Sequence, residues 1–256
     1  MRLLVTGANG RIGRMLRHIW AGEADILWHA RQAGPGVDVV WDMGSGPVLD
    51  LPGDLVVLHL AGRIGQYAAA TRAVLGLGAV QVLVMSSAAV YGPGVAAWRE
   101  SDPVAPKTPY AIDKLEAEVA ARGHPGVTLL RLANLAGADG LLGSLVPERE
   151  VVLDPIEGQM GGPERSYIGP RVLAGVLRGL LGRELPPVIN VAQPGQVSMA
   201  ALLEARGQPW RFGPSRVGAV GRLVVDVALL AGLVPLPPIS AAGLVADMDS
   251  VPGWPR

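Results

Sequence analysis

The chain has 256 residues, of which half are hydrophobic and only 4% are aromatic, and its 22 basic side chains balance 22 acidic ones. An apolar content this high in a chain of this length can bury a substantial core, which excludes a disordered protein. A net charge of zero with no basic stripe argues against nucleic-acid binding. The absence of cysteine excludes disulfides, thiol nucleophiles and cysteine-ligated metals.

The most apolar stretches are too short for targeting or for crossing a membrane. The run Leu3–Val5 is far shorter than a signal-peptide core, and residues 223–234 are interrupted by Asp226 and have about half the length that a bilayer requires. We therefore expect a cytoplasmic protein with no membrane partner. We also predict no metal site, because the histidines show no ligand spacing.

Short apolar strands alternate with helical segments through the first half of the chain. The expected strands are Leu3–Thr6, Ile26–His29, Val37–Trp41, Leu55–Leu60, Val80–Ser86 and Val127–Leu132, and the expected helices are Arg11–Ala21, Tyr67–Leu75 and Tyr110–Ala121. These strands are apolar through most of their length, as strands buried on both faces are. The alternation predicts repeated βαβ units and therefore an α/β fold with a doubly wound parallel sheet.

After about Asn134 the sequence becomes rich in glycine and proline. A further strand is expected at Val188–Val191, followed by a helix that Ser198 caps. The final dozen residues are expected to form a loosely held tail.

A glycine-rich turn joins the first strand to the first helix. Gly7, Gly10 and Gly13 are placed so that backbone N–H groups can approach a pyrophosphate closely and the helix can pack tightly on the strand. Their position after the first strand of a βαβ series strengthens the signal for a dinucleotide site, whereas a tight turn without a ligand is the alternative. The other residues assigned to this site from the same turn are Asn9, Arg11 and Ile12.

Tyr110 and Lys114 are separated by one helical turn on the predicted helix, so their side chains share a face. A tyrosine is a poor base at neutral pH because its ordinary pKa is near 10. A cation one turn away favours the phenolate, so the pair is suited to proton transfer.

Four segments in order resemble one enzyme superfamily. They are the TGxxGxxG turn at 6–13, the SSxxVYG pattern at 86–92, an acidic proline-bearing stretch at 100–106 and the YxxxK pair at 110–114. Together they resemble the extended short-chain dehydrogenase/reductase superfamily, in particular the NAD(P)-dependent epimerase/dehydratase family, of which this would be a short member. The resemblance implies a Rossmann core at 1–136, to which 166–197 returns, and a small C-terminal substrate-binding lobe at 137–165 and 198–256.

The resemblance also implies the catalytic roles. Ser87 would donate a hydrogen bond to the substrate oxygen and Tyr110 would exchange a proton with it, while Lys114 would hold the nicotinamide ribose and lower the pKa of Tyr110. Ser86 would replace Ser87 if the register shifted by one residue. The alternative is that this set has no catalytic role and consists of a helix cap and an ordinary surface lysine.

The end of the second strand distinguishes between the two dinucleotides. A free 2′-hydroxyl is usually bound by an acidic residue here and a 2′-phosphate by a cation. The chain offers Arg31, with Arg11 near by, and no acid until Asp38, so NADP is preferred and NAD remains possible. The resemblance further implies that Asp42 contacts the adenine and that the backbone of Leu60, Ala61 and Gly62 runs beside the cofactor. The side chain of His59 is expected to be a core histidine.

Later segments resemble the family's substrate site in eroded form. Asn134 in an RxxNxxG segment would lie at the mouth of the substrate cleft, and Arg165 and Arg216 would clamp the diphosphate of a nucleotide sugar through bidentate bonds. The alternative places each arginine on a solvated face. Only 23 residues separate Gly62 from Ser86, so the crossover between those strands is expected to be short. The chain is also shorter than most extended members, which points to a reduced substrate lobe and leaves a ligand smaller than a nucleotide sugar as the alternative.

We therefore expect an NAD(P)-dependent oxidoreductase or epimerase acting on a secondary alcohol or ketone, in the first instance of a nucleotide sugar. One alternative is a dehydrogenase or reductase of a small free carbonyl compound or sugar acid. Another is a protein that senses NADP without turnover, against which the set Ser87, Tyr110 and Lys114 argues. The alanine-rich face of Tyr110–Ala121 permits a homodimer.

Overall fold

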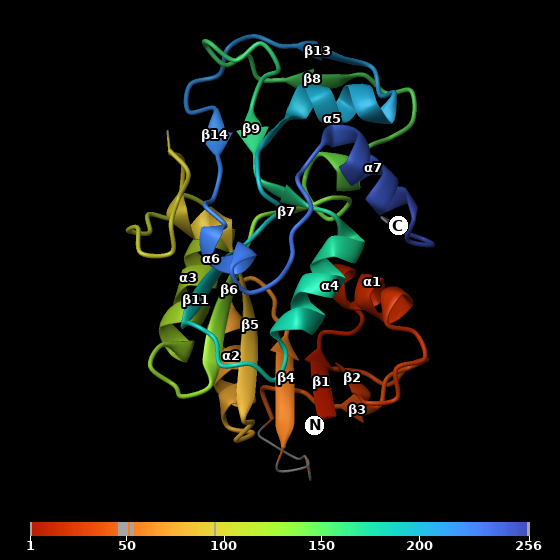
Figure 1. The fold of residues 1–256 in the computed structure, drawn as a ribbon, viewed down its shortest axis with the longest axis vertical. Helices are drawn as coiled ribbons and strands as arrows, with labels where there is room; N and C mark the ends of the chain where they lie inside the picture. Colours follow the sequence, from red (N-terminus) through yellow and green to blue (C-terminus); the bar gives the residue numbers. More distant parts are fainter. Residues whose placement is uncertain (1, 46–50, 52–53, 95, 255–256) are drawn as a thin grey trace. The chain divides into compact units, whose positions relative to one another are not determined.

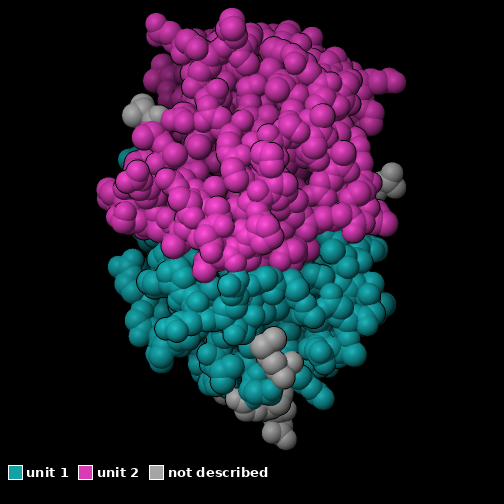
Figure 2. Space-filling view, viewed as in Figure 1, with its two compact units in different colours: residues 1–90, 105–131, 177–189 teal, residues 91–104, 132–176, 190–256 magenta. Residues whose placement is uncertain are grey.

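The computed structural model describes residues 2–45, 51, 54–94 and 96–254. The chain divides into two compact units, drawn in two colours in Figure 2. Unit 1 comprises residues 1–90, 105–131 and 177–189, and unit 2 comprises 91–104, 132–176 and 190–256. Within the described ranges, no helix combines the length and apolar character that a bilayer crossing requires.

A seven-stranded sheet, to which unit 1 contributes most residues, has the strand order β11-β6-β5-β4-β1-β2-β3 (Figure 1). The strands are β1 (Arg2–Thr6), β2 (Ile26–Ala30), β3 (Val39–Val40), β4 (Leu55–His59), β5 (Gln81–Ser87), β6 (Val127–Leu132) and β11 (Val188–Val191). β1 pairs in parallel with both β2 and β4, β2 pairs in parallel with β3, and β4 with β5. The chain thus starts in the middle of the sheet and the strand order reverses at β1, where doubly wound sheets bind their ligands. The predicted α/β class and sheet are confirmed.

The helices between these strands are α1 (Arg11–Ile19), α2 (Tyr67–Leu75), α3 (Pro109–Ala121) and α4 (Pro170–Leu180), and a short 3₁₀ helix, η1 (Ala88–Tyr91), follows β5. Thr108 caps α3 by accepting a hydrogen bond from the Ala111 N–H, and Pro109 occupies the first turn, where its missing N–H costs nothing. α2 and α3 pack closely against each other. This packing brings the start of α2 against the YxxxK face of α3.

Two expected elements are shorter than predicted. The third strand has only the two residues Val39–Val40, because the chain emerges from a turn around Gly36 and pairs only with the last two residues of β2. The first helix ends at Ile19, and the N–H of Trp20 closes the last turn on Leu16.

The described part of unit 2 contains three small sheets. β7 (Asn134–Leu135) pairs with β10 (Tyr167–Ile168), and β8 (Val151–Leu153) pairs with β13 (Trp210–Phe212). β9 (Glu164–Arg165) lies between β12 (Val197–Ser198) and β14 (Arg222–Leu223).

The remaining helices are η2 (Leu142–Ser144), α5 (Met199–Arg206), α6 (Ala228–Ala231) and α7 (Ala241–Asp249). As predicted, Ser198 caps α5, accepting a hydrogen bond from Ala201.

The prediction of a loose C-terminal tail is wrong as far as residue 254. Leu244, Val245 and Met248 of α7 are buried, and Met248 follows the other two by four and three residues, which places them on one helix face. The indole Nε1 of Trp254 donates to the Ala136 carbonyl at 2.9 Å. The buried apolar face of α7 and this hydrogen bond hold the segment against the rest of unit 2.

The expected domain segments can be located in the two units. Both segments expected to form the lobe, 137–165 and 198–256, fall within unit 2. Residues 91–104 also belong to unit 2, and the late segment of unit 1 is 177–189, which lies within the expected return segment 166–197.

Candidate active site

The glycine turn has the close backbone approaches that its sequence predicts. Gly7 has φ +77°, and a Cβ there would lie 3.0 Å from the Ala61 nitrogen. A Cβ on Gly13 would lie 2.7 Å from the Cα of Ala8, so only glycine permits α1 to pack this tightly on the turn. Gly10 donates to the Gly7 carbonyl at 2.9 Å. The turn therefore leaves its backbone accessible where a pyrophosphate would bind.

A cavity of about 540 Å³ opens beside this turn within unit 1. The predicted cofactor residues that line it are Gly7, Asn9, Gly10, Arg31, Asp42, Leu60, Ala61 and Gly62. Arg11, Ile12 and Gly13 follow directly as the first residues of α1. Asp42 also shapes its own loop, because its carboxylate accepts from the Gly44 N–H at 3.1 Å. The structure thus brings together residues that the sequence placed after four different strands.

A polar row crosses the carboxyl ends of β2, β1 and β4. Thr6 is in register with His29 on one side and His59 on the other. The Thr6 hydroxyl oxygen accepts from the N–H groups of Leu60 and Ala61 at 3.1 and 3.2 Å, so its proton is free to go to His59 Nδ1, 2.8 Å away. Burial, together with the nearby charges of Lys114 and His29, lowers the pKa of His59 to about 3. His59 is therefore a neutral core histidine, as expected, and the row fixes the loop beside the cavity.

His29 was missed as a site residue by sequence reasoning, since it has no ligand spacing. It is 2% exposed, lines the cavity, and its Nε2 lies 2.8 Å from the Trp41 carbonyl. That bond requires the proton on Nε2, which leaves Nδ1 as an acceptor, and among the described residues Nδ1 has no partner. Burial lowers the pKa of His29. A neutral acceptor thus lies in the wall of the cavity.

Ser87 and Tyr110 come together from β5 and α3. Ser87 is the last residue of β5, and its hydroxyl oxygen accepts from the Ala89 N–H at 3.2 Å. Tyr110 lies in the first turn of α3 with 38% of its surface exposed. Partial burial raises the pKa of Tyr110, and a hydrogen bond with Ser87 opposes the rise. The Ser87 hydroxyl therefore contacts the phenol of Tyr110.

Lys114 is held by the strand below it and by an aromatic ring. It is 6% exposed, and its Nζ donates to the Met85 carbonyl at 2.9 Å. The same atom lies 6.0 Å from the ring centre of Tyr110 and 3.7 Å from that of Tyr67. Burial lowers the pKa of Lys114 to about 8, against the opposing charges of Asp113 and Glu118. No sequence signal indicated Tyr67, because it lies on a different helix.

The neighbouring Ser86 belongs to a buried ion-pair network. Its hydroxyl donates to Glu118 Oε1 at 2.6 Å, and Arg131 donates to both oxygens of that carboxylate at 3.0 and 2.8 Å. All three residues are buried. Because the Ser86 hydroxyl is committed to Glu118, the geometry favours Ser87 over Ser86 as the donor beside Tyr110.

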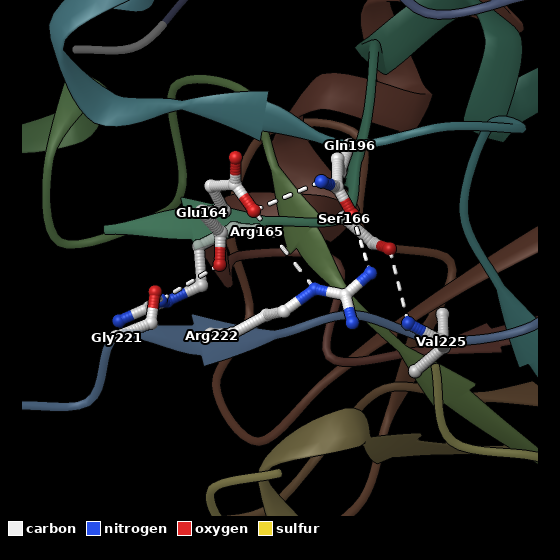
Figure 3. Close-up of polar contacts among 7 residues, drawn as sticks. All are labelled: Glu164, Arg165, Ser166, Gln196, Gly221, Arg222 and Val225. Carbon is white, nitrogen blue, oxygen red and sulfur yellow. Dashed lines mark hydrogen bonds and ion pairs between the residues drawn. The ribbon is translucent and has the colours of Figure 1, made fainter. Parts of the chain in front are cut away.

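Unit 2 has a second cavity, of about 710 Å³. Asn134 and Arg165, both predicted to bind substrate, line it together with Arg149, which the sequence analysis missed. The guanidinium of Arg165 is held by backbone carbonyls: Nη1 donates to Glu164 at 2.8 Å and Nη2 to Val220 at 2.7 Å. Figure 3 shows this side chain directed towards Gly221, the residue before β14. A fixed cation therefore forms part of the cavity wall.

Arg216, the other predicted clamp residue, forms an ion pair with a carboxylate of the cavity lining. Its Nε lies 3.3 Å from Asp154, which lines the cavity, and its own side chain is 69% exposed. Arg222 was not singled out in the sequence; it donates to Gln196 at 2.7 Å and lies 3.9 Å from Glu164 (Figure 3). The two predicted arginines are thus differently placed, one fixed in the wall and one exposed.

The comparisons with known proteins agree with the fold. Residues 56–149 match the model of the NAD dependent epimerase/dehydratase family. No curated protein sequence gives a match. The match covers β4 through β7, including Ser87, Tyr110 and Lys114.

Solved structures match nearly the full length of the chain. TunA, described as an NAD-dependent NDP-hexosamine 5,6-dehydratase involved in tunicamycin biosynthesis, is 20% identical with a TM-score of 0.74, over 98% of each chain. UDP-glucuronic acid 4-epimerase from Bacillus cereus, in complex with UDP-glucuronic acid and NAD, is 18% identical with a TM-score of 0.74, over 96% of this chain and 97% of that one. dTDP-glucose 4,6-dehydratase from Bacillus anthracis, in complex with NAD, is 16% identical with a TM-score of 0.73, over 97% and 96%.

Similarity at this level of identity establishes the fold. The predicted Rossmann fold is therefore confirmed, and residues 56–149 are similar to the NAD dependent epimerase/dehydratase family that the sequence motifs resemble.

Proposed function

We propose that this protein is an NAD(P)-dependent enzyme of the epimerase/dehydratase type that oxidises a secondary alcohol of a nucleotide sugar. The observation that carries the proposal is the set Ser87, Tyr110 and Lys114 within unit 1, the unit that also contains the dinucleotide-like cavity. The relatives of similar fold are described with NAD and nucleotide sugars, which supports the same class of ligands here.

The catalytic step needs a base for the hydroxyl proton of the substrate. Tyr110 would take that proton, and Ser87, which bonds to the phenol in the structure, would donate to the same substrate oxygen. The nicotinamide, when bound, supplies the hydride acceptor. Lys114 would favour the phenolate of Tyr110, because a positive charge near by stabilises the ionised form. Epimerisation would require Tyr110 to return the proton while the hydride returns to the opposite face of the carbonyl carbon. Dehydration would require loss of water from the oxidised sugar before the hydride returns to the unsaturated product.

The cofactor would lie against the glycine turn, Asp42 and the loop that follows β4. We propose NADP as the preferred dinucleotide because Arg31, an exposed cation lining the cavity, follows β2 where a 2′-phosphate is usually bound. The relatives described with a cofactor contain NAD, so the NADP preference depends on Arg31 alone.

The substrate would be held by its diphosphate in the cavity of unit 2. Arg165 and Asn134 line that cavity, Arg149 adds a third polar group, and Arg216 would act with Asp154 at its edge. Guanidinium groups suit diphosphate oxygens because they form charge-assisted, bidentate hydrogen bonds.

Replacing the proposed base tests the function. Tyr110→Phe removes the phenolic hydroxyl and keeps the ring, so we expect turnover of the nucleotide-sugar substrate to fall by about 10²–10⁴-fold, the usual contribution of general acid–base catalysis. Cofactor affinity, measured by fluorescence titration, should change little. The pair Lys114→Met and Lys107→Met provides a matched control, since Lys107 is exposed and only the first variant should lose activity.

A Tyr110→Phe variant that retained a tenth or more of the wild-type turnover would contradict the assignment of the base. A wild-type protein that bound the dinucleotide and turned over no nucleotide sugar or small carbonyl compound would favour a cofactor sensor instead.

A further inference from the structure

The loop after β4 connects the wall of the unit 1 cavity to the catalytic helix. Gly62 lines the cavity with φ +144°, and a Cβ at this position would collide with the ring of Tyr67. Further along the loop, the N–H of Gly65 donates to the Asp113 carboxylate at 2.6 Å. Asp113 lies on α3 and is 5% exposed. The glycine makes room for the ring, and the hydrogen bond anchors the loop to α3.

This loop places the face of Tyr67 against a buried cation. The ammonium nitrogen of Lys114 lies over the ring, 3.7 Å from its centre. The rings of Tyr67 and Tyr110 meet edge to face, with centres 6.4 Å apart and an interplanar angle of 82°. An aromatic face attracts a cation, and most strongly where water is excluded. One ring of α2 therefore contacts both of the residues that form the YxxxK pair of α3.

Burial alone would disfavour the charged form of Lys114. Other groups must therefore stabilise the ammonium. On its own helix these are Asp113 and Glu118. Glu118 is paired with Arg131, which compensates much of its charge, and on β4 the neutral His59 contributes no anion. The Met85 carbonyl on β5 accepts one proton of the ammonium. From α2, the group that faces the ammonium is the ring of Tyr67.

We propose that Tyr67 is a positioning residue, whose ring face holds the Lys114 ammonium in its charged form beside Tyr110. The catalytic meaning of that position depends on the function proposed above, in which charged Lys114 favours the phenolate of Tyr110. The contact itself is a property of the folded chain and does not depend on any substrate.

The chain offers a direct measurement because Lys107 and Lys114 are its only lysines. In protein labelled with ¹³C at the lysine ε-carbon, each lysine gives one signal whose chemical shift follows its protonation. The pH titration is to be recorded for wild type, Tyr67→Phe and Tyr67→Leu, with the exposed Lys107 as internal reference.

The two variants distinguish the effect of the aromatic face from the effect of apolar bulk. Phenylalanine keeps the aromatic face, so the Lys114 midpoint should stay at its wild-type value. Leucine keeps apolar cover without a π-face, so the midpoint should fall by about one pH unit. The Lys107 midpoint should be the same in all three proteins. If Tyr67→Leu does not fold, Tyr67→Met is the replacement, as a flexible apolar side chain that fills a similar space.

A Lys114 midpoint that stays unchanged or rises in the leucine or methionine variant would overturn the proposal. So would a fall in Tyr67→Phe as large as that in Tyr67→Leu. The titration needs no turnover, so a failure of the proposed enzymatic function would leave its result unaffected. Conversely, loss of activity in Tyr110→Phe with an unmoved Lys114 midpoint in Tyr67→Leu would retain the function and reject the role of Tyr67.

Discussion

Arg31 follows β2 and presents an exposed guanidinium in the lining of the unit 1 cavity. The next acid along the chain, Asp38, accepts a hydrogen bond from the Trp28 N–H at 2.9 Å and so ties β2 to the segment before β3. The carboxylate that would compete for a ribose hydroxyl is thus engaged with the backbone. At this position the available charge is positive, which suits a 2′-phosphate.

Arg31→Ala tests the choice of dinucleotide. We expect NADPH binding to weaken by about 1–3 kcal/mol, the scale of a lost charge-assisted hydrogen bond, and NADH binding to stay nearly unchanged. Arg14→Ala, which removes an exposed arginine from α1, is the matched control and should alter neither affinity. Both affinities are measured by fluorescence titration, and equal weakening of NADPH and NADH would reject the NADP preference.

Single residues differ in how far the sequence reveals them. Ser87, Tyr110 and Lys114 were predictable because two of them share a helix face and the third ends the strand beneath that helix. Tyr67 was not predictable because its position depends on how α2 packs against α3. His29 was not predictable because its orientation depends on a hydrogen bond to the Trp41 carbonyl. Arg149 was missed because an exposed arginine in a loop has no local pattern that distinguishes a cavity from solvent.

At the scale of elements, the carboxyl ends of β1, β2 and β4 carry the row formed by Thr6, His29 and His59. Both histidines are buried, and burial lowers the pKa of each. The row orients the loop 60–62 through the Thr6 hydroxyl and depends on neutral imidazoles. Protonation should therefore loosen the part of the sheet that supports the cavity.

Acid should destabilise the fold through His59 in a defined pH range. Its pKa is about 3 in the folded chain against an ordinary 6.5, so the unfolded chain binds the proton more readily. Its contribution to stability is complete above the ordinary value and is lost as the pH falls from there towards 3. At about pH 5 the loss amounts to about 2 kcal/mol, and His29 adds to it in the same direction.

His59→Gln removes this proton uptake, so its free energy of unfolding should fall less between about pH 7.5 and pH 5 than that of the wild type. Urea unfolding at both pH values measures the difference, and His124→Gln, an exposed site, serves as control. Wild type and His59→Gln with the same dependence on pH would show that His59 titrates normally in the folded chain.

The elements that the sequence predicts well are those set by local pattern. The buried strands of the sheet appear as apolar runs, and β6, β11 and α2 have the predicted bounds. The tail was mispredicted because proline and glycine near the end obscured the apolar face of α7. The small sheets of unit 2 escaped prediction because pairs of two or three residues are held by tertiary contacts rather than by their own periodicity.

At the scale of the whole molecule, the described residues of each compact unit line a cavity. The cavity of unit 1 combines the glycine turn with Arg31 and Asp42. The cavity of unit 2 combines Arg149 and Arg165 with three carboxylates, those of Asp139, Glu150 and Asp154. The proposed function assigns the dinucleotide to the first cavity and the substrate to the second.

The homodimer expected from the alanine-rich face of α3 remains a prediction. α3 exposes Ile112 and Val119, which are seven residues apart and therefore lie on one face.

Thermal unfolding in the presence of ligands tests the account most directly. The protein is heated with saturating NADP or NAD, and then with UDP, dTDP, GDP or small sugar acids added to the dinucleotide. A ligand at about 100 times its Kd adds about 2.7 kcal/mol, which for a chain of this size raises the Tm by several degrees. We predict such a rise with the dinucleotide, larger for NADP, and a second rise with one nucleoside diphosphate. A rise with the dinucleotide and a sugar acid alone would replace the nucleotide sugar by a small carbonyl substrate, and no rise with either dinucleotide would contradict the account as a whole.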